Sequence, residues 1–112
     1  MYSLNAYALH PSPPLTDREG WNDVVRSRQG VTYVALFEDG VPASGAAATA
    51  MIQNVRGTLF AAHGVWGVAT APAARRTCYC RGGIAALLAA GRADGQAFST
   101  LYPFRESFYG RL

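Results

Sequence analysis

The segment from Thr58 to Tyr102 constrains the fold more than any other part of the sequence. Residues 58–70 are rich in β-branched, aromatic and small side chains and predict a strand, which ends at Pro72. An arginine-rich turn follows, and apolar residues then recur at the i, i+3, i+4 and i+7 spacing of a buried helix face. With a short strand expected over 97–102, this order predicts a right-handed crossover between two parallel strands. The expected buried helix face consists of Ile84, Leu87, Leu88 and Gly91.

The residues before this segment predict antiparallel strands. Residues 31–37 are β-branched, aromatic or apolar, and Asp39 and Gly40 then form a dipeptide favoured in tight hairpin turns. The returning strand begins at Val41 and includes the alanine-rich residues 43–51; alanine favours helices, but the hairpin signal before it favours a strand. The predicted fold class is therefore α/β (α+β), with a mixed sheet in which an antiparallel meander is followed by a β-α-β unit.

Helices are also expected near both ends of the chain. The first fifteen residues contain three prolines, so we expect a loose N-terminal arm, 1–15, without a helix. Thr16 and Glu19 form a capping-box pattern, and apolar residues follow at helical spacing, which predicts a helix from Asp17 to Ser27. A last turn of helix is expected over 106–112.

Length and composition limit the class of protein. The chain has 112 residues, which allows one small domain, and hydrophobic residues make up 50% of it, which is enough to form a core. Its apolar stretches are much shorter than the roughly 20 residues that a membrane span needs. The N-terminus lacks the charged start and apolar run of a secretory signal, so a cytoplasmic location is expected.

All the basic residues are arginines, and the formal net charge is +3. This excess favours an anionic ligand but is modest for a nucleic-acid-binding protein. Arg75, Arg76 and Arg81 lie where the first N–H groups of the predicted helix are unpaired, which is a favourable place for a phosphate group. The same arginines could instead form a solvated helix cap, and charge alone leaves both readings open.

The cysteines and histidines offer few other chemical readings. Cys78 and Cys80 are too close in sequence for an ordinary disulfide, so reduced thiols are expected. A metal site would need His10 or His63 as further ligands, and these lack zinc spacing. His63 lies within a predicted strand and is interpreted as a packed residue rather than a general base.

From the third predicted strand onward, the sequence resembles the Gcn5-related N-acetyltransferase (GNAT) superfamily, and within it the enhanced-intracellular-survival (Eis) type. The runs GVWGVATAPAARRTCYCRGGIAALLAAGRADG and AFSTLYPFRESFYGRL carry the resemblance, which covers about residues 31–112. It implies an N-acetyltransferase that transfers acetyl from acetyl-coenzyme A to a primary amine. A neutral amine would attack the thioester, and a tyrosine would protonate the departing thiolate.

The resemblance also implies roles for particular residues. Cys78 stands where the family has a nearly invariant glycine, and its Cβ would crowd a close backbone approach. Tyr109 takes the place of the catalytic tyrosine. The acetyl-pantetheine arm would meet the backbone edge of Val68, Ala69 and Thr70, and the pyrophosphate loop would consist of Arg75, Arg76, Thr77, Cys78, Tyr79, Cys80 and Arg81.

Family domains begin with an additional strand and helix and continue through two further strands. The resemblance therefore implies that residues 1–112 form a single partial GNAT domain, incomplete at both ends. Such a sheet would leave strand edges exposed, so a homodimer is expected. Two alternatives are a catalytically impaired coenzyme A-binding remnant and a structural module that assembles through exposed sheet edges. No metal, nucleic acid or membrane is expected as a partner.

Overall fold

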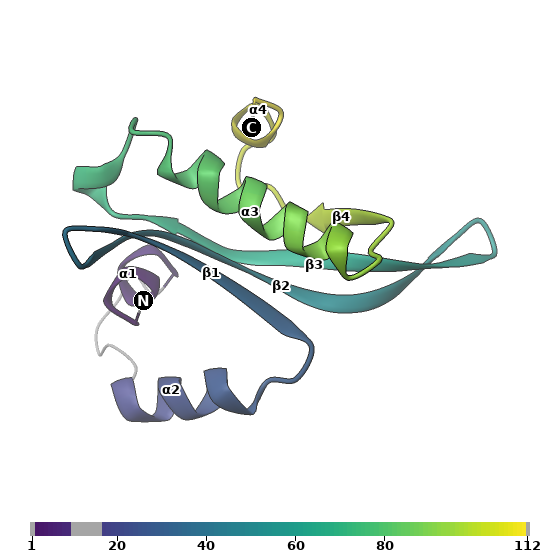
Figure 1. Ribbon diagram of the computed structural model, residues 1–112, viewed down its shortest axis with the longest axis horizontal. Coiled ribbons are helices and arrows are strands. Elements are labelled where there is room, and N and C mark those ends of the chain that lie inside the picture. The colour runs from purple at the N-terminus through teal and green to yellow at the C-terminus, as the bar shows by residue number, and fades with distance from the viewer. Residues whose placement is uncertain (1, 10–16, 112) are drawn as a thin grey trace.

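The computed structural model of the chain describes residues 2–9 and 17–111. It consists of a four-stranded mixed sheet with helices on both faces (Figure 1). The strand order is β1-β2-β3-β4; β1, β2 and β3 are antiparallel neighbours, and β4 runs parallel to β3. The predicted fold class, including the β-α-β unit, is confirmed. The strands are β1 (Val31–Glu38), β2 (Val41–Val55), β3 (Thr58–Thr70) and β4 (Phe98–Leu101).

Two tight turns set the register of the meander. Asp39 and Gly40 both have positive φ, 49° and 76°, as a two-residue hairpin turn requires. Arg56 and Gly57 repeat this pattern between β2 and β3, and the Asn54 side chain accepts a hydrogen bond from the Gly57 N–H (2.8 Å). The prediction of a strand for the alanine-rich segment is therefore confirmed.

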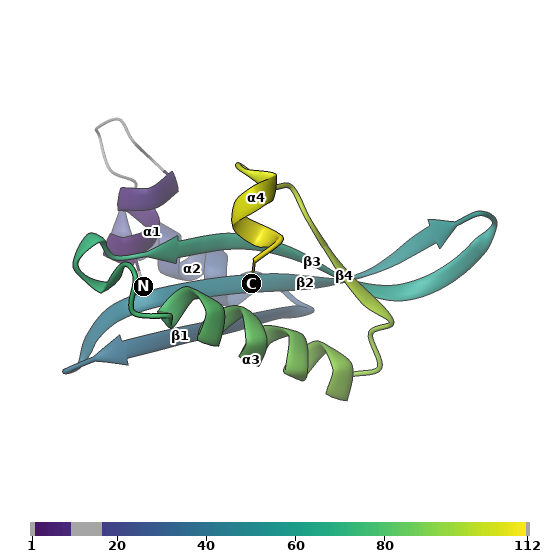
Figure 2. The same cartoon turned by 90° about the horizontal axis from the view of Figure 1, so that it is seen from above.

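The helix α3 (Tyr79–Ala93) covers one face of the sheet and forms the core with it (Figure 2). Ile84, Leu87 and Gly91 are buried as predicted, but Leu88 is 43% exposed. Gly83 takes its place on the buried face, where the Leu36 side chain lies so close that a Cβ would meet it at 3.3 Å. The buried face of α3 therefore consists of Gly83, Ile84, Leu87 and Gly91.

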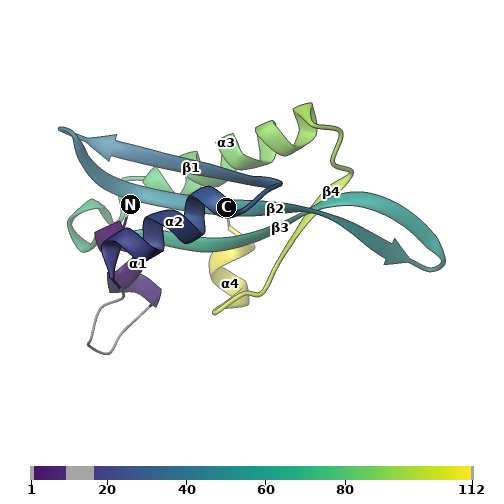
Figure 3. The same cartoon turned by 90° about the horizontal axis from the view of Figure 1, so that it is seen from below.

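The first helix, α1 (Tyr2–Leu9), corrects the expectation that residues 1–15 contain no helix. Leu4 and Ala6 are buried, and α1 contacts β2 and β3 on the face opposite α3 (Figure 3). The physical reason is that proline restricts the residues next to it, and every proline of this segment follows Leu9. The rest of the expected arm lies outside the described residues.

The other helices agree with the predictions except at their ends. In α2 (Arg18–Ser27), the Asp17 carboxylate caps the helix by accepting hydrogen bonds from the N–H groups of Glu19 and Gly20, at 3.3 and 2.8 Å. Thr16, the expected cap, lies outside the described residues. At the other end, α4 (Glu106–Tyr109) is shorter than predicted. No helix within residues 2–9 and 17–111 has the length and apolar character needed to cross a membrane.

Candidate functional site

Beyond its pairing with β4, strand β3 has an open edge. The last β3–β4 pair is Val65 with Leu101, whereas β3 continues to Thr70, so residues 66–70 have no strand on this side in the described chain (Figure 2). Two residues of β3 oppose one of β2 near Gly67, whose φ is +63°, and this bulge bends the strand. Unpaired backbone groups on such an edge can bind an extended ligand.

The three residues expected to bind the acetyl-pantetheine arm, Val68, Ala69 and Thr70, differ in the direction of their backbone groups. The Ala69 carbonyl accepts a hydrogen bond from the buried Ser44 hydroxyl of β2 (3.1 Å), so Ala69 turns its backbone toward β2. Backbone groups alternate in direction along a strand, which leaves those of Val68 and Thr70 for the open edge. The Ser44 hydroxyl also lies 3.0 Å from the Thr70 hydroxyl.

The arginine-rich loop presents a row of free backbone N–H groups. Within the described part of the chain, the N–H groups of residues 76–81 have no hydrogen-bond acceptor, and the next one, of Gly82, donates to the Cys78 carbonyl (3.0 Å). Arg76 and Cys78 have left-handed backbone conformations, with φ of 66° and 65°. Alternating conformations of this kind and a helix N-terminus both direct N–H groups toward an anion.

The arginine side chains of this loop are exposed. The Arg75 guanidinium donates a hydrogen bond to the Tyr7 hydroxyl of α1 (3.4 Å), a contact that the sequence did not indicate because α1 was not expected. Arg76 and Arg81 make no ion pair with any described residue. Their charges are therefore available to a ligand held by the N–H groups.

Tyr109 lies near the start of α3, on the same side of the sheet. Its ring contacts those of Phe104 and Phe108, with centroid distances of 5.7 and 5.1 Å. Burial raises the pKa of the Tyr109 phenol, and the nearby Cys80 charge raises it further. The phenol therefore stays protonated at neutral pH and can donate a proton.

Cys80 connects Tyr109 to the end of β3. Burial raises the pKa of the Cys80 thiol, while hydrogen bonding with the Thr70 side chain lowers it by a smaller amount. Cys78 is exposed and Cys80 is half-buried, and both are free thiols. The structure thus brings Thr70, Cys80 and Tyr109 together from three separate elements.

A carboxylate that the sequence did not single out lies beside the loop. This carboxylate is Glu38, at the end of β1. The pKa of the Tyr79 phenol is raised, mainly because its side chain is hydrogen-bonded to Glu38. Glu38, at the β1–β2 hairpin, therefore contacts Tyr79, the first residue of α3.

His63 is packed, as its position in a strand predicted. It is 1% exposed, and its Nδ1 has no hydrogen-bond partner. No three metal-ligating side chains within the described ranges lie close enough together to hold a metal ion.

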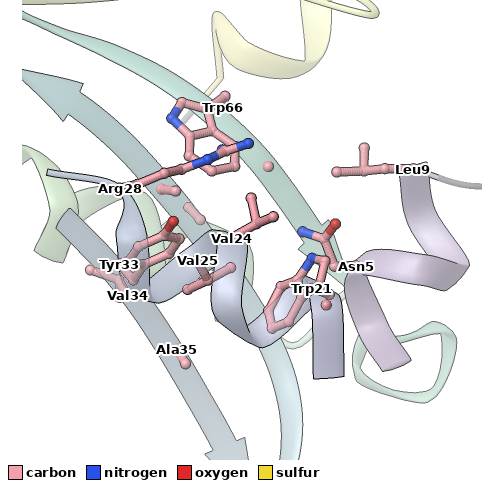
Figure 4. Close-up of a pocket in the computed structure, with 14 residues that line it drawn as sticks. Asn5, Leu9, Trp21, Val24, Val25, Arg28, Tyr33, Val34, Ala35 and Trp66 are labelled. Carbon is pink, nitrogen blue, oxygen red and sulfur yellow. The ribbon is translucent and has the colours of Figure 1, made fainter. Parts of the chain in front are cut away.

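An apolar cavity of about 710 Å³ lies on the opposite face of the sheet, under α1 and α2 (Figure 4). The Trp66 ring forms part of its wall and is held by three contacts. Its Nε1 donates to the Thr49 hydroxyl (2.9 Å), the Tyr33 ring lies edge-on with centroids 5.9 Å apart, and the Arg28 guanidinium carbon lies 4.8 Å from the ring centroid. The wall also contains Asn5, Trp21, Val24, Val25 and Gly67.

The sequence matches the family model of the acetyltransferase (GNAT) domain over residues 1–112. No curated protein matches it. Among solved structures, the GCN5-related N-acetyltransferase from Kribbella flavida has a TM-score of 0.80 at 19% identity, covering 98% of this chain and 28% of that one. For Eis1 from Mycobacterium abscessus, the TM-score is 0.79 at 17% identity, with 98% and 27% covered. The glucosamine-6-phosphate N-acetyltransferase from Arabidopsis thaliana has a TM-score of 0.78 at 13% identity, with 99% and 79% covered. At these identities the likenesses show a shared fold.

Proposed function

The chain belongs to the GNAT acetyltransferase family, and from this premise we propose that it binds acetyl-coenzyme A and transfers the acetyl group to a primary amine. One observation carries the proposal: after the open edge of β3, the chain enters a loop and the first turn of α3, where the N–H groups of residues 76–81 have no partner among the described residues. An extended amide chain that ends in a pyrophosphate has the shape and charge that these two features together can bind.

The residues present fit such a ligand. Backbone groups of Val68 and Thr70 would pair with the amides of the pantetheine arm, and the loop N–H groups with Arg76 and Arg81 would hold the pyrophosphate. The thioester supplies an activated acetyl group when it is bound. The exposed Arg75 would add charge at the α1 side of the loop.

The transfer requires one proton to leave the amine and one to reach the thiolate. The amine nitrogen forms a bond to the acetyl carbon, the carbon–sulfur bond breaks, and the amine proton passes to water. Tyr109 would protonate the departing sulfur and recover its proton from solvent. Its raised pKa supports this role, because the phenol is protonated throughout the neutral range.

Three finer features belong to the same proposal. An Eis-type relationship is supported by the fold shared with Eis1. Self-association as a homodimer is supported by the outer edge of β1, which pairs with no described strand and exposes Tyr33 and Phe37. A cytoplasmic location is supported by the sequence alone.

Charge reversal at Arg76 tests coenzyme A binding. Arg76→Glu should weaken binding by about 1.5–3 kcal/mol, because a charged hydrogen bond to phosphate is lost. Isothermal titration with coenzyme A measures this. Arg92→Glu, at the other end of α3, changes the net charge equally and should bind like the parent protein. Equal affinities of the two variants for coenzyme A would contradict pyrophosphate binding by this loop.

Cys78→Gly should improve both folding and binding. Its φ of +65° is strained for a side chain and free for glycine, so we expect a gain of about 1 kcal/mol in the free energy of unfolding. Coenzyme A should also bind more tightly, because the N–H groups can then approach the pyrophosphate. Cys78→Ala is the matched control, since it removes the thiol but keeps the Cβ. Weaker binding by Cys78→Gly than by Cys78→Ala would contradict this expectation.

A further inference from the structure

The cavity under α2 has the position expected of a second substrate site. Its wall includes Trp66 and Gly67, the first two residues of the open edge of β3. It lies on the face of the sheet opposite α3. Resting on the proposed function, we infer that this cavity binds the acceptor, and that the acceptor is an amine with an aromatic or large aliphatic body and a carboxylate, as in an apolar amino acid.

The lining defines the body of the acceptor. At about 710 Å³ the cavity has the size of a small-molecule site, and aromatic and branched aliphatic residues make up half of its lining (Figure 4). Among the described residues that line it, none is acidic. A polycationic amine would leave its charges uncompensated there, whereas an apolar body gains from burial.

Arg28 indicates the second group of the acceptor, the carboxylate. Its guanidinium lies over the Trp66 ring, at the cavity wall, and makes no ion pair with any residue in the ranges 2–9 and 17–111. Stacking on the ring fixes the plane of the guanidinium and leaves its N–H groups free to hold a carboxylate in two parallel hydrogen bonds. The Asn5 amide, also in the wall, offers further hydrogen bonds.

The same surroundings prepare the amine for attack. An ammonium ion is disfavoured in an apolar cavity and also near the positive charge of Arg28. Both effects favour the neutral amine, which is the form that can attack the thioester. The cavity therefore needs no carboxylate or histidine base in its wall.

Intrinsic fluorescence tests this inference without any acetyl transfer, because both tryptophans of the chain, Trp21 and Trp66, line the cavity. L-phenylalanine, phenethylamine and spermidine are titrated while tryptophan is excited selectively. L-phenylalanine should change the emission at the lowest concentration. Phenethylamine, which lacks the carboxylate, should bind about 10- to 100-fold more weakly, and spermidine should cause no change.

Arg28→Met keeps the aliphatic stem and removes the charge. It should lower the affinity for L-phenylalanine toward that for phenethylamine, whereas phenethylamine should bind no more weakly, because the repulsion between its ammonium group and the guanidinium is removed. No emission change with L-phenylalanine, or equal binding of spermidine, would overturn the inference. Coenzyme A titration separates the two proposals: a protein that binds coenzyme A but not L-phenylalanine retains the proposed function and loses this acceptor. One that binds L-phenylalanine but not coenzyme A retains the cavity assignment and loses the function.

Discussion

Replacing Tyr109 with phenylalanine should lower the rate of acetyl transfer by about 10²–10⁴-fold, the usual contribution of a general acid, and should leave coenzyme A affinity unchanged. The variant keeps the ring contacts with Phe104 and Phe108 and loses only the hydroxyl that would protonate the sulfur. Release of the free thiol measures turnover, and titration calorimetry measures affinity. Because the pKa of this phenol is raised from 10.0, its ionisation should not lower the parent's rate below about pH 10.

Tyr102→Phe is the matched control for this substitution. The Tyr102 side chain is fully exposed just after β4, so the loss of its hydroxyl should not change turnover. Equal turnover by Tyr109→Phe and Tyr102→Phe would contradict the proposed role of Tyr109 as the general acid. Coenzyme A binding without transfer in any of the proteins, the parent included, would favour the reading of a binding remnant.

Gly91→Ala should destabilise the fold by about 3 kcal/mol, the upper part of the range for overpacked cores. A Cβ at this position would lie 2.5 Å from His63 Nδ1 and 2.8 Å from Cε1. His63 is 1% exposed, so either its ring would have to repack or α3 would have to shift from the sheet. Chemical denaturation followed by circular dichroism measures the change in the free energy of unfolding.

Gly82→Ala, on the same helix, provides the control. The nearest atom to its added Cβ is 3.8 Å away, so the higher helix propensity of alanine should stabilise the protein by about 0.5–1 kcal/mol. Combining Gly91→Ala with His63→Ala should recover part of the lost stability, because the small side chain leaves room for the new methyl group. Equal stability of Gly91→Ala and Gly82→Ala would show that His63 does not limit the approach of α3.

Local signals made the sheet predictable. The turn dipeptide Asp39–Gly40 acts over a few residues and fixes where β2 begins, so this strand boundary followed from the sequence. The helix α1 did not follow, because its stability comes from burying Leu4 and Ala6 against strands far along the chain. The exposure of Leu88 also depends on tertiary packing, since helical periodicity cannot tell which edge of an apolar stripe the sheet covers.

In the candidate site, too, some features have a local signal in the sequence and others depend on the fold. The position of the arginine-rich loop at the start of α3 was predictable, because its arginines and the helix start are contiguous in sequence. The approach of Tyr109 to Cys80 depends on the path of the chain through β4 and α4 and has no local signal. The cavity was missed for a similar reason: Arg28, Tyr33 and Trp66 come from three elements, and their side chains are brought together only by the folded sheet.

The placement of the two candidate sites on different sides of β3, around Gly67, has a consequence for the kinetics of the proposed reaction. The open edge of β3 and the cavity under α2 reach this strand from different sides, so occupation of one does not obstruct the other. Under the proposed function, both substrates would be bound at once, and the acetyl group would pass directly between them with no acylated form of the protein. Initial rates measured against both substrates should therefore give intersecting double-reciprocal lines, as a ternary complex requires, and not the parallel lines of a ping-pong scheme.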